Sequence, residues 1–251
     1  ADIIDGETAL KFLTTLDGEI FAHAKFPHDF NVDSEQAYTV FKTFSKSIYL
    51  HVTTSNLRNA EFGSILKSNS NGTSYVLSED FVNRDAAGYV DFEKIQGIEG
   101  VAVINVVTNH EEVVDAKTGA SKKLKTKITH NDAAEWAYLA PPAVDSEGNA
   151  YPCVKQGKPF LECSLNLHGF TERVDFRDTY SSGSAAGMMI GVGNVGDFLD
   201  NDRSTSSTFL TRDGGITWTE IHKKALSWEY GDQGSIIMLV DHTEPPKEFT
   251  Y

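Results

Sequence analysis

Apolar runs recur along the chain and are separated by polar stretches rich in glycine, asparagine and aspartate. The strongest runs are residues 47–54 (SIYLHVTT), 100–109 (GVAVINVVTN), 187–194 (GMMIGVGN) and 234–242 (GSIIMLVDH). Shorter runs rich in β-branched and aromatic residues lie between them, as in STFLTR and TWTEIH. Short runs of this kind with turn signals between them are typical of antiparallel strands. The pattern predicts an all-β chain.

One eight-residue motif occurs between two such strands, and it occurs more than once. Residues 211–218 read TRDGGITW, and the related stretches are 129–136 (THNDAAEW), 68–75 (SNSNGTSY) and 14–21 (TTLDGEIF). A hydroxyl residue begins each copy and an aromatic residue ends it. A repeated supersecondary unit decides the architecture of a chain, so the repeat takes precedence over the single motif.

The third position of the motif changes between copies, from Asp213 to Asn131, Ser70 and Leu16. A catalytic acid is not exchanged for serine or leucine in sister copies. A turn needs only a short polar side chain that accepts hydrogen bonds from backbone N–H groups. We therefore interpret the motif as structural, with a positive φ at Gly215 and an aromatic ring packed beneath the turn. The structural residues expected on this basis are Thr211, Asp213, Gly215, Trp218, Thr129, Asn131, Trp136, Ser68, Gly72 and Tyr75.

The spacing of the motif predicts the size of the repeating unit. The four copies begin at residues 14, 68, 129 and 211, which lie 54, 61 and 82 residues apart. Each interval has room for three or four strands, and four-stranded units repeated at this length are propeller blades. The chain starts within one unit, and residues 247–251 (KEFTY) occupy the position of the strand before a fifth motif. We expect a partial β-propeller of about four blades over residues 1–251.

The net charge of the chain excludes one class of binding partner. The chain has a formal net charge of −14 at pH 7 and a pI of about 4.9, which argues against nucleic acid as a partner. A local exception is the basic stretch 117–127 (KTGASKKLKTK), which we expect to be a hairpin facing solvent, with a partner-binding patch as the alternative. No apolar run reaches the roughly 18 residues that a membrane span needs.

Few residues suggest a cofactor or a metal. The stretch GVGNVG at 191–196 fits a dinucleotide-binding pattern formally, but a polar loop follows it instead of the required helix, so close backbone approach is the simpler interpretation. The histidines show no zinc-ligand spacing, although together they could respond to pH between about 5 and 7. We expect neither metal nor cofactor. The histidines are His23, His28, His51, His110, His130, His168, His222 and His242.

Two modification sites can be named from the sequence. Cys153 and Cys163 are the only cysteines, and the spacing C-x9-C in a loop-like stretch fits either a disulfide or two reduced thiols. Asn71-Gly72-Thr73 is an N-glycosylation sequon within the motif copy at 68–75.

The repeated motif is the Asp-box, and its context resembles one family. The stretches KLKTKITHNDAAEW with LAPP, the C-x9-C followed by SLNLHG, MMIGVGNVG, TFLTRDGGITWTEI and SWEYGDQGSIIML are collinear with the sortilin family of vacuolar protein sorting receptors, in particular its fungal type. The resemblance covers residues from about 45 to 251, with a looser match before them.

The resemblance implies a ten-bladed propeller on the lumenal side of Golgi and late endosome membranes. It implies a receptor, not an enzyme, that carries soluble vacuolar hydrolases, bound directly or through their propeptides, to the endosome and vacuole. Further blades, cysteine-rich modules, a membrane span and a tail would lie outside these residues. It also implies that Cys153 pairs with Cys163, that Asn71 carries a glycan and that Ser68 contacts ligand.

Two other functions remain as alternatives. An Asp-box glycoside hydrolase of the sialidase type would need a cluster of arginines around a substrate carboxylate, and this chain has six scattered arginines. A purely structural or assembly propeller would bind no soluble cargo.

Overall fold

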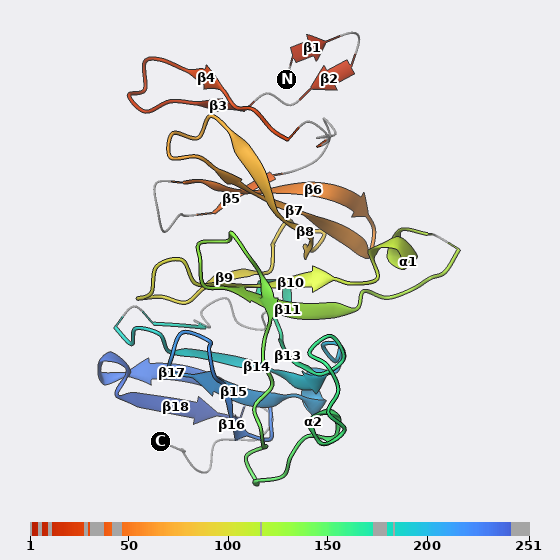
Figure 1. Ribbon diagram of the computed structural model, residues 1–251, viewed down its shortest axis with the longest axis vertical. Coiled ribbons are helices and arrows are strands. Elements are labelled where there is room, and N and C mark those ends of the chain that lie inside the picture. Colours follow the sequence, from red (N-terminus) through yellow and green to blue (C-terminus); the bar gives the residue numbers. More distant parts are fainter. Residues whose placement is uncertain are drawn as a thin grey trace.

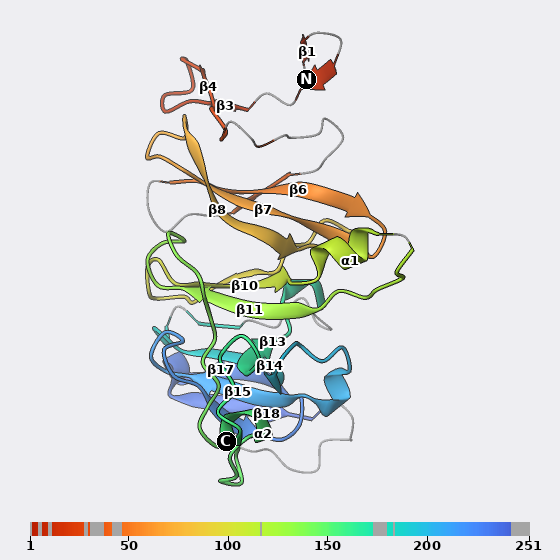
Figure 2. The same ribbon diagram turned by 45° about the vertical axis from the view of Figure 1, so that its right-hand side comes forward.

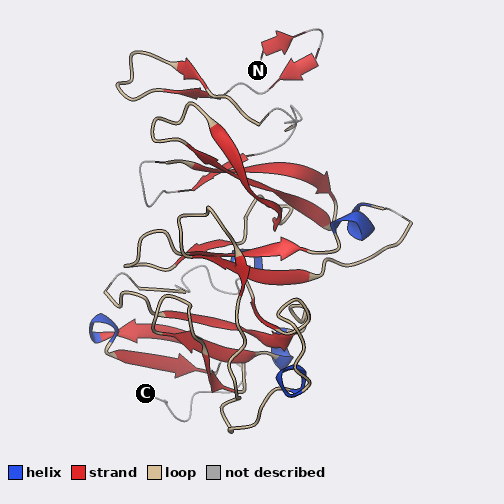
Figure 3. Ribbon diagram, in the orientation of Figure 1, coloured by secondary structure: helices blue, strands red, loops and turns tan. Residues whose placement is uncertain are grey.

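The computed structural model describes residues 2–4, 7–9, 12–27, 30, 38–41, 47–115, 117–172, 180–182 and 184–241. Strands dominate these residues, and the helices are short and lie at the ends of strands or in loops (Figure 3). The strand pairs of these residues are antiparallel, and within each sheet most strands pair with the next one along the chain; β8 and β10 also pair at Val82 and Val106. The sheets follow one another along the long axis of the molecule, from the N-terminus to the C-terminus (Figure 1).

Three sets of four strands form the centre of the molecule, and we call them the first, second and third blades. The first blade contains β5 (Tyr38–Phe41), β6 (Tyr49–Leu57), β7 (Ala60–Ser68) and β8 (Tyr75–Asn83). The second contains β9 (Phe92–Lys94), β10 (Ala102–Val107), β11 (Leu124–Thr129) and β12 (Ala137–Tyr138). The third contains β13 (Ser164–Leu167), β14 (Met189–Gly196), β15 (Ser207–Thr211) and β16 (Thr219–His222).

Shorter sheets flank the blades. Two hairpins precede them, formed by β1 (Asp2–Ile4) with β2 (Glu7–Ala9) and by β3 (Leu13–Thr14) with β4 (Ala22–His23). After the third blade, β17 (Ser227–Gly231) pairs with β18 (Ile236–Val240). The helical segments are α1 (His110–Val114), α2 (Pro152–Lys155) and the single turns η1 (Phe170–Glu172), η2 (Arg203–Thr205) and η3 (Asp232–Gly234). The all-β propeller fragment expected from the sequence is confirmed, whereas residues 247–251 lie outside the described part.

The apolar runs became the second strand of each blade because that strand is covered on both faces. β10 is buried at every position, and β14 is buried over its first five residues. A continuous apolar run is the pattern expected for a strand between two packed layers. In the view turned by 45°, the blades remain stacked face to face (Figure 2).

The cores lie between blades. The largest cluster joins the second and third blades and β17, and contains Ile128, Leu165, Ile190, Phe209 and Trp228 among others. A second cluster, with Tyr49, Ile65 and Ile104 among its members, joins the first and second blades. A blade is therefore stabilised mainly by its neighbours, as in other repeat architectures.

A buried polar centre also ties three blades together. The Asp91 carboxylate accepts hydrogen bonds from Asn83 Nδ2 at 2.7 Å and Asn105 Nδ2 at 3.2 Å through Oδ2. Its Oδ1 accepts one from the backbone N–H of Thr171 at 2.8 Å. Asn83 ends the first blade, Asn105 lies in the second and Thr171 follows the third blade's first strand. Burial raises the pKa of Asp91, against the effect of these donors.

The GVGNVG stretch lies in β14 and forms no nucleotide-binding loop. A Cβ on Gly193 would stand 1.8 Å from the carbonyl oxygen of Asn166 on β13. Glycine is required here by the close approach of two paired strands, as the sequence interpretation proposed.

The expectation that residues 117–127 form a solvent-facing basic hairpin holds for only part of the stretch, because residues 117–119, 121 and 123 are exposed in the connection between the paired strands β10 and β11 whereas the residues after them are not. Leu124–Thr129 is β11, inside the second blade. The side chain of Lys125 is only 2% exposed, and Lys122 is largely buried against Glu61. Lysines fit here because each contacts a carboxylate, a carbonyl or an aromatic ring of an adjacent segment. In KLKTKIT, residues 123–129, the lysines alternate with other side chains because successive residues of a strand point to opposite faces of the sheet.

Candidate functional site

The Asp-box turn at 211–218 joins β15 to β16 and is closed by side chains. Thr211 Oγ1 donates to Asp213 Oδ1 at 2.8 Å and accepts from the backbone N–H of Gly215 at 2.9 Å. Asp213 Oδ1 also accepts from the backbone N–H of Thr217 at 2.9 Å. Burial would raise the pKa of Asp213, but these hydrogen bonds outweigh it and lower that pKa. Beneath the turn, the buried Trp218 donates from Nε1 to the carbonyl of Gly215.

The copy at 129–136 joins β11 to β12 and repeats this pattern atom by atom. Thr129 Oγ1 donates to Asn131 Oδ1 at 3.1 Å and accepts from the N–H of Ala133 at 3.0 Å. Asn131 Oδ1 accepts from the N–H of Glu135 at 2.9 Å. Trp136 differs from Trp218, because its Nε1 donates to the hydroxyl of Ser78 in the first blade. An amide thus performs the same task as the carboxylate of Asp213.

The two N-terminal copies keep the acceptor but move it by one residue. Asp17, not Leu16, accepts from the N–H groups of Glu19 at 2.8 Å and Ile20 at 2.9 Å. The bonds from Ile20 and Glu19 lower the pKa of Asp17. The acceptor that the sequence alignment treated as lost at Leu16 is therefore present.

In the copy at 68–75, Asn69 rather than Ser70 accepts from the N–H groups of Thr73 at 2.9 Å and Ser74 at 3.2 Å. Both turns keep a side-chain hydrogen-bond acceptor before a glycine with positive φ, Gly18 or Gly72, but the acceptor does not occupy the same position of the motif. In all four copies the polar side chain caps backbone N–H groups, so its role is structural.

Neighbouring turns touch one another. Thr14 Oγ1 donates to the carbonyl of Asn71 at 3.1 Å. Lys67, beside the second turn, forms a 2.8 Å ion pair with Asp132 in the third. The ring Nε2 of His130 lies 3.0 Å from the carbonyl of Gly214 in the fourth turn. The Asp-box turns therefore form a continuous row along the stack of blades.

Ser68 is the one residue that the resemblance assigns to ligand. It is 5% exposed, its Oγ accepts from the N–H of Ile48 at 2.7 Å and donates to the carbonyl of Asn69 at 2.8 Å. The hydroxyl thus links the residue before β6 to the turn after β7, and a ligand contact through Ser68 stays a prediction. Tyr75 packs in the core with Leu50 and Leu66.

The sequon lies at the surface of the second turn. Asn71 is exposed, and its Oδ1 accepts from the hydroxyl of Thr73 at 2.6 Å. The two residues that define the sequon are thus adjacent and reachable. Glycosylation of Asn71 stays a prediction.

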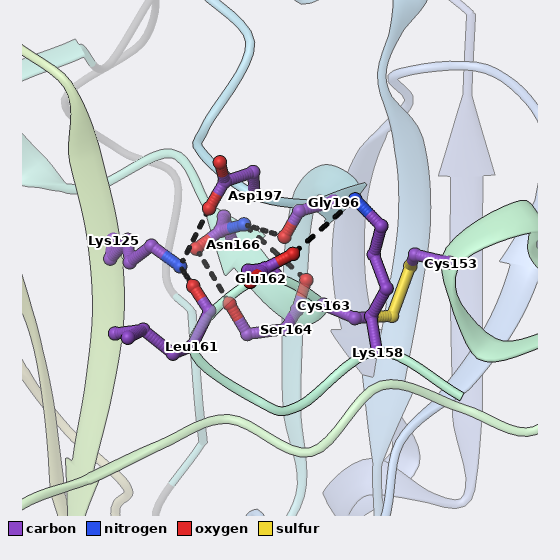
Figure 4. Close-up of a disulfide and its surroundings, with 10 residues drawn as sticks. All are labelled: Lys125, Cys153, Lys158, Leu161, Glu162, Cys163, Ser164, Asn166, Gly196 and Asp197. Atoms are coloured by element: carbon purple, nitrogen blue, oxygen red, sulfur yellow. Dashed lines mark hydrogen bonds and ion pairs between the residues drawn. A yellow bond between two sulfur atoms is a disulfide. The ribbon is translucent and has the colours of Figure 1, made fainter. Parts of the chain in front are cut away.

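The disulfide expected from the resemblance is present. Cys153 and Cys163 are bonded, with a Cα–Cα distance of 5.6 Å (Figure 4). We call residues 153–163 the disulfide loop. Its side chains Phe160 and Leu161 are 59% and 60% exposed.

Lys125 fixes the disulfide loop to β11. Its Nζ donates to the carbonyl of Leu161 and forms a 3.3 Å ion pair with Asp197, which follows β14 (Figure 4). Burial lowers the pKa of Lys125, against the effect of Asp197. One buried ammonium group therefore connects the disulfide loop, the second blade and the third blade.

A groove of about 560 Å³ lies beside the disulfide loop, between the end of β8 and the outer face of β11 and β12. Three aromatic rings line it, those of Phe81, Tyr138 and Phe198. Lys123, Lys125 and Lys127 enter from one face of β11, and Nζ of Lys125 lies 5.2 Å from the centre of the Tyr138 ring. No groove was expected from the sequence. The available signal was the basic alternation within residues 117–127, for which a solvent-facing hairpin was expected and a partner-binding patch was the alternative.

The histidines do not converge on one site within the described residues. His51 is buried in the first blade, and burial lowers its pKa to about 4. His168 is buried in the third blade, between Glu172 and Ser206. His28 and His242 lie outside the described residues. Among the residues that the structure describes, no group of three or more His, Cys, Asp or Glu side chains is arranged to hold a metal, and no helix is long and apolar enough to cross a membrane.

Comparison with known proteins gives a consistent result over the whole chain. The Sortilin-Vps10 family profile, described as sortilin, neurotensin receptor 3, matches residues 1–251. The chain is 56% identical over 251 residues to the vacuolar protein sorting/targeting protein 10 of Debaryomyces hansenii, covering 100% of this chain and 15% of that protein. It is 55% identical over 246 residues to the protein of the same name from Coccidioides posadasii, covering 98% of this chain and 16% of that protein.

This chain therefore spans only 15–16% of the length of these relatives. Among solved structures, a GH74 xyloglucanase from Xanthomonas campestris aligns with a TM-score of 0.34 and 13% identity, covering 80% of this chain and 26% of that chain. A likeness at that level carries no argument about function.

Proposed function

The chain belongs to the Sortilin-Vps10 family, and from this premise we propose that it forms part of the lumenal cargo-binding region of a vacuolar sorting receptor. The observation that carries the proposal is the match over residues 1–251, together with relatives more than half identical that are named as vacuolar sorting proteins. The cargo is a soluble vacuolar hydrolase, recognised directly or through its propeptide. The receptor collects it in the Golgi and delivers it toward the endosome and vacuole.

Two features of the chain support a lumenal position. The Cys153–Cys163 disulfide fits an oxidising compartment, where such bonds form and persist. Asn71 and Thr73 offer an exposed sequon, which is used only in the secretory pathway.

Two-stranded sheets and exposed apolar side chains beside the three blades support membership of a larger propeller. Among the described residues, β3–β4 and β17–β18 are sheets of two strands, whereas β13–β16 form a sheet of four. Leu16 and Ile20 near one edge and Ile236 and Met238 at the other are exposed. Further blades of the same receptor would cover these apolar side chains and complete the sheets.

An enzymatic role has little support. The named relatives are sorting proteins and not enzymes. The carboxylates of Asp17 and Asp213 accept hydrogen bonds from backbone N–H groups of their own turns, so their role is structural and not that of a catalytic acid.

The test is binding of a vacuolar hydrolase carrying its propeptide to the full receptor that contains this chain. We expect binding at about pH 6.5 and weaker binding at about pH 5, as a receptor that releases its cargo in the more acidic endosome requires. Surface plasmon resonance at both pH values measures it. Absence of binding at either pH would contradict the cargo role and favour a structural or assembly propeller.

A further inference from the structure

The groove beside the disulfide loop has the dimensions of a binding site. Its volume of about 560 Å³ falls within the range of ligand pockets in proteins. It is lined by residues of β8, β10, β11 and β12, and the exposed side chain of Leu161 is part of its lining. Buried Lys125 and the disulfide hold the loop that closes one side. The groove is thus preformed and rimmed by apolar surface.

The charges of the lining favour a cation. Five carboxylates face three lysines, which leaves a formal charge of −2. The carboxylates are those of Glu79, Asp80, Glu112, Glu162 and Asp197, and the lysines are Lys123, Lys125 and Lys127. The ammonium groups are already engaged, as in the 3.0 Å ion pair of Lys127 with Glu79. An anionic ligand would meet paired lysines and an excess of like charge.

Three of the carboxylates remain accessible to a ligand. The side chains of Glu112, Glu162 and Asp197 are 56%, 52% and 51% exposed. Glu112 lies 3.9 Å from Lys123, and Glu162 lies 3.4 Å from Lys158 on the surface. Solvated pairs of this kind contribute about 1 kcal/mol or less, so a ligand cation can share or replace these partners.

Apolar surface lies next to these carboxylates. The ring of Phe198 is only partly buried, and Phe81 stacks on the ring of His110 with a centroid distance of 3.5 Å. Phe81 also holds a positive φ of 57°, which turns the end of β8 at the groove. Among the described residues, Nδ1 of His110 is buried without a hydrogen-bond partner. A ligand with an apolar side chain beside a cationic one would match both parts of the lining.

We propose that this groove binds an extended peptide segment of a soluble cargo protein, in which lysine or arginine adjoins an aromatic or aliphatic side chain. The basic group meets the carboxylates of Glu112 and Glu162, whose lysine partners are solvated, and the apolar side chain packs against Phe81 and Phe198. The net charge of −14 on the chain accelerates the encounter with such a segment. The inference rests on the proposed function for the source of the segment, whereas the groove and its chemistry come from the structure.

The experiment uses a short fluorescein-labelled peptide containing arginine next to leucine and phenylalanine, and the full receptor that contains this chain. The groove variant is Glu112→Lys with Glu162→Lys. Its matched control is Glu111→Lys with Glu99→Lys, which makes the same charge change at exposed residues outside the groove. We expect the groove variant to bind about tenfold more weakly, and the control less than about twofold, by fluorescence anisotropy. Phe198→Ala should weaken binding as well, and a peptide with glutamate for arginine should not bind.

Equal losses in the groove variant and the control would overturn the inference, because they would reflect overall charge alone. Failure of the wild-type receptor to bind the arginine peptide would overturn it too. Binding of an intact hydrolase with its propeptide is measured on the same variants. Cargo binding that the groove variant retains in full contradicts the inference and leaves the receptor function intact. The wild type could bind no cargo while binding of the arginine peptide is still weakened in the groove variant. That result would contradict the proposed receptor function and the origin of the segment in a cargo protein, and it would support the groove as a peptide-binding site.

Discussion

At the scale of single residues, the fifth position of the Asp-box turn adopts a positive φ in different copies, but the space around its Cβ differs between them. Gly215 has a φ of 85° and Gly18, in the turn at 15–20, one of 80°, and Ala133 meets a similar need at 59°. Ala133 shows that a side chain is tolerated where there is room. A Cβ on Gly215 would lie 2.3 Å from Cδ1 of Ile128, whereas one on Gly18 would meet nothing within 4 Å. The surroundings, rather than the dihedral angle, decide how strictly glycine is needed.

Substituting these two glycines separates the effects of strain and packing. Gly18→Ala should lower the free energy of unfolding by about 1 kcal/mol, the cost of a left-handed conformation with a Cβ. Gly215→Ala should lower it by more than about 2 kcal/mol, because Ile128 must also move. Urea unfolding followed by tryptophan fluorescence measures both. Similar losses in the two variants would mean that the contact with Ile128 adds nothing.

At the scale of elements, the disulfide loop ends a long connection between β12 and β13 whose regular structure is the short helix α2. Its order comes from the Cys153–Cys163 bond and from Lys125, which binds the carbonyl of Leu161. The loop has few interior contacts of its own, since Phe160 and Leu161 point to solvent. The disulfide and the Lys125 hydrogen bond therefore fix the conformation of the loop in place of buried apolar contacts.

Removing the disulfide tests this account. Cys153→Ser with Cys163→Ser should lower the free energy of unfolding by about 2–3 kcal/mol in the chain-entropy description of a loop this size. Thermal unfolding with and without reductant measures the change. The wild type in reductant should match the variant, and the variant should not respond to reductant. A variant less stable than the reduced wild type would show that the serine side chains, and not the missing bond alone, cause part of the loss.

The sequence predicted some elements far better than others. The second strands, such as β10, were found because burial on both faces leaves a long apolar run. The first strands, such as β9 (Phe92–Lys94), were not among the predicted elements, because three residues of mixed polarity carry no periodic signal. The turns were located correctly, yet Asp17 and Asn69 escaped because a hairpin can shift its acceptor by one residue. The groove escaped because its lysines are stabilised by carboxylates and rings from segments distant in sequence.

At the scale of the whole molecule, Asp91 is a point where three blades meet. Its carboxylate satisfies donors from Asn83, Asn105 and Thr171. Gly169 approaches the same carboxylate so closely that a Cβ there would stand 2.3 Å from Oδ1 of Asp91. A single buried acceptor thus sets the spacing between successive blades.

Asp91→Ala should lower the free energy of unfolding by about 2–4 kcal/mol at neutral pH, because buried donors lose their acceptor. Burial raises the pKa of Asp91, so its contribution is complete below the ordinary pKa of an aspartate and declines as pH rises through the raised value. The difference between wild type and variant should therefore grow on acidification. Urea unfolding at several pH values measures it, and a difference that shrinks in acid would contradict the assigned direction.

The row of Asp-box turns has a mechanical consequence. Contacts such as Thr14 with Asn71, Lys67 with Asp132 and His130 with Gly214 link each turn to the next along one edge of the stack. Because these contacts lie along one edge, we expect successive blades to tilt relative to one another about that edge. Under load, neighbouring blades would separate first on the side away from the turns, while the fastened edge keeps its length.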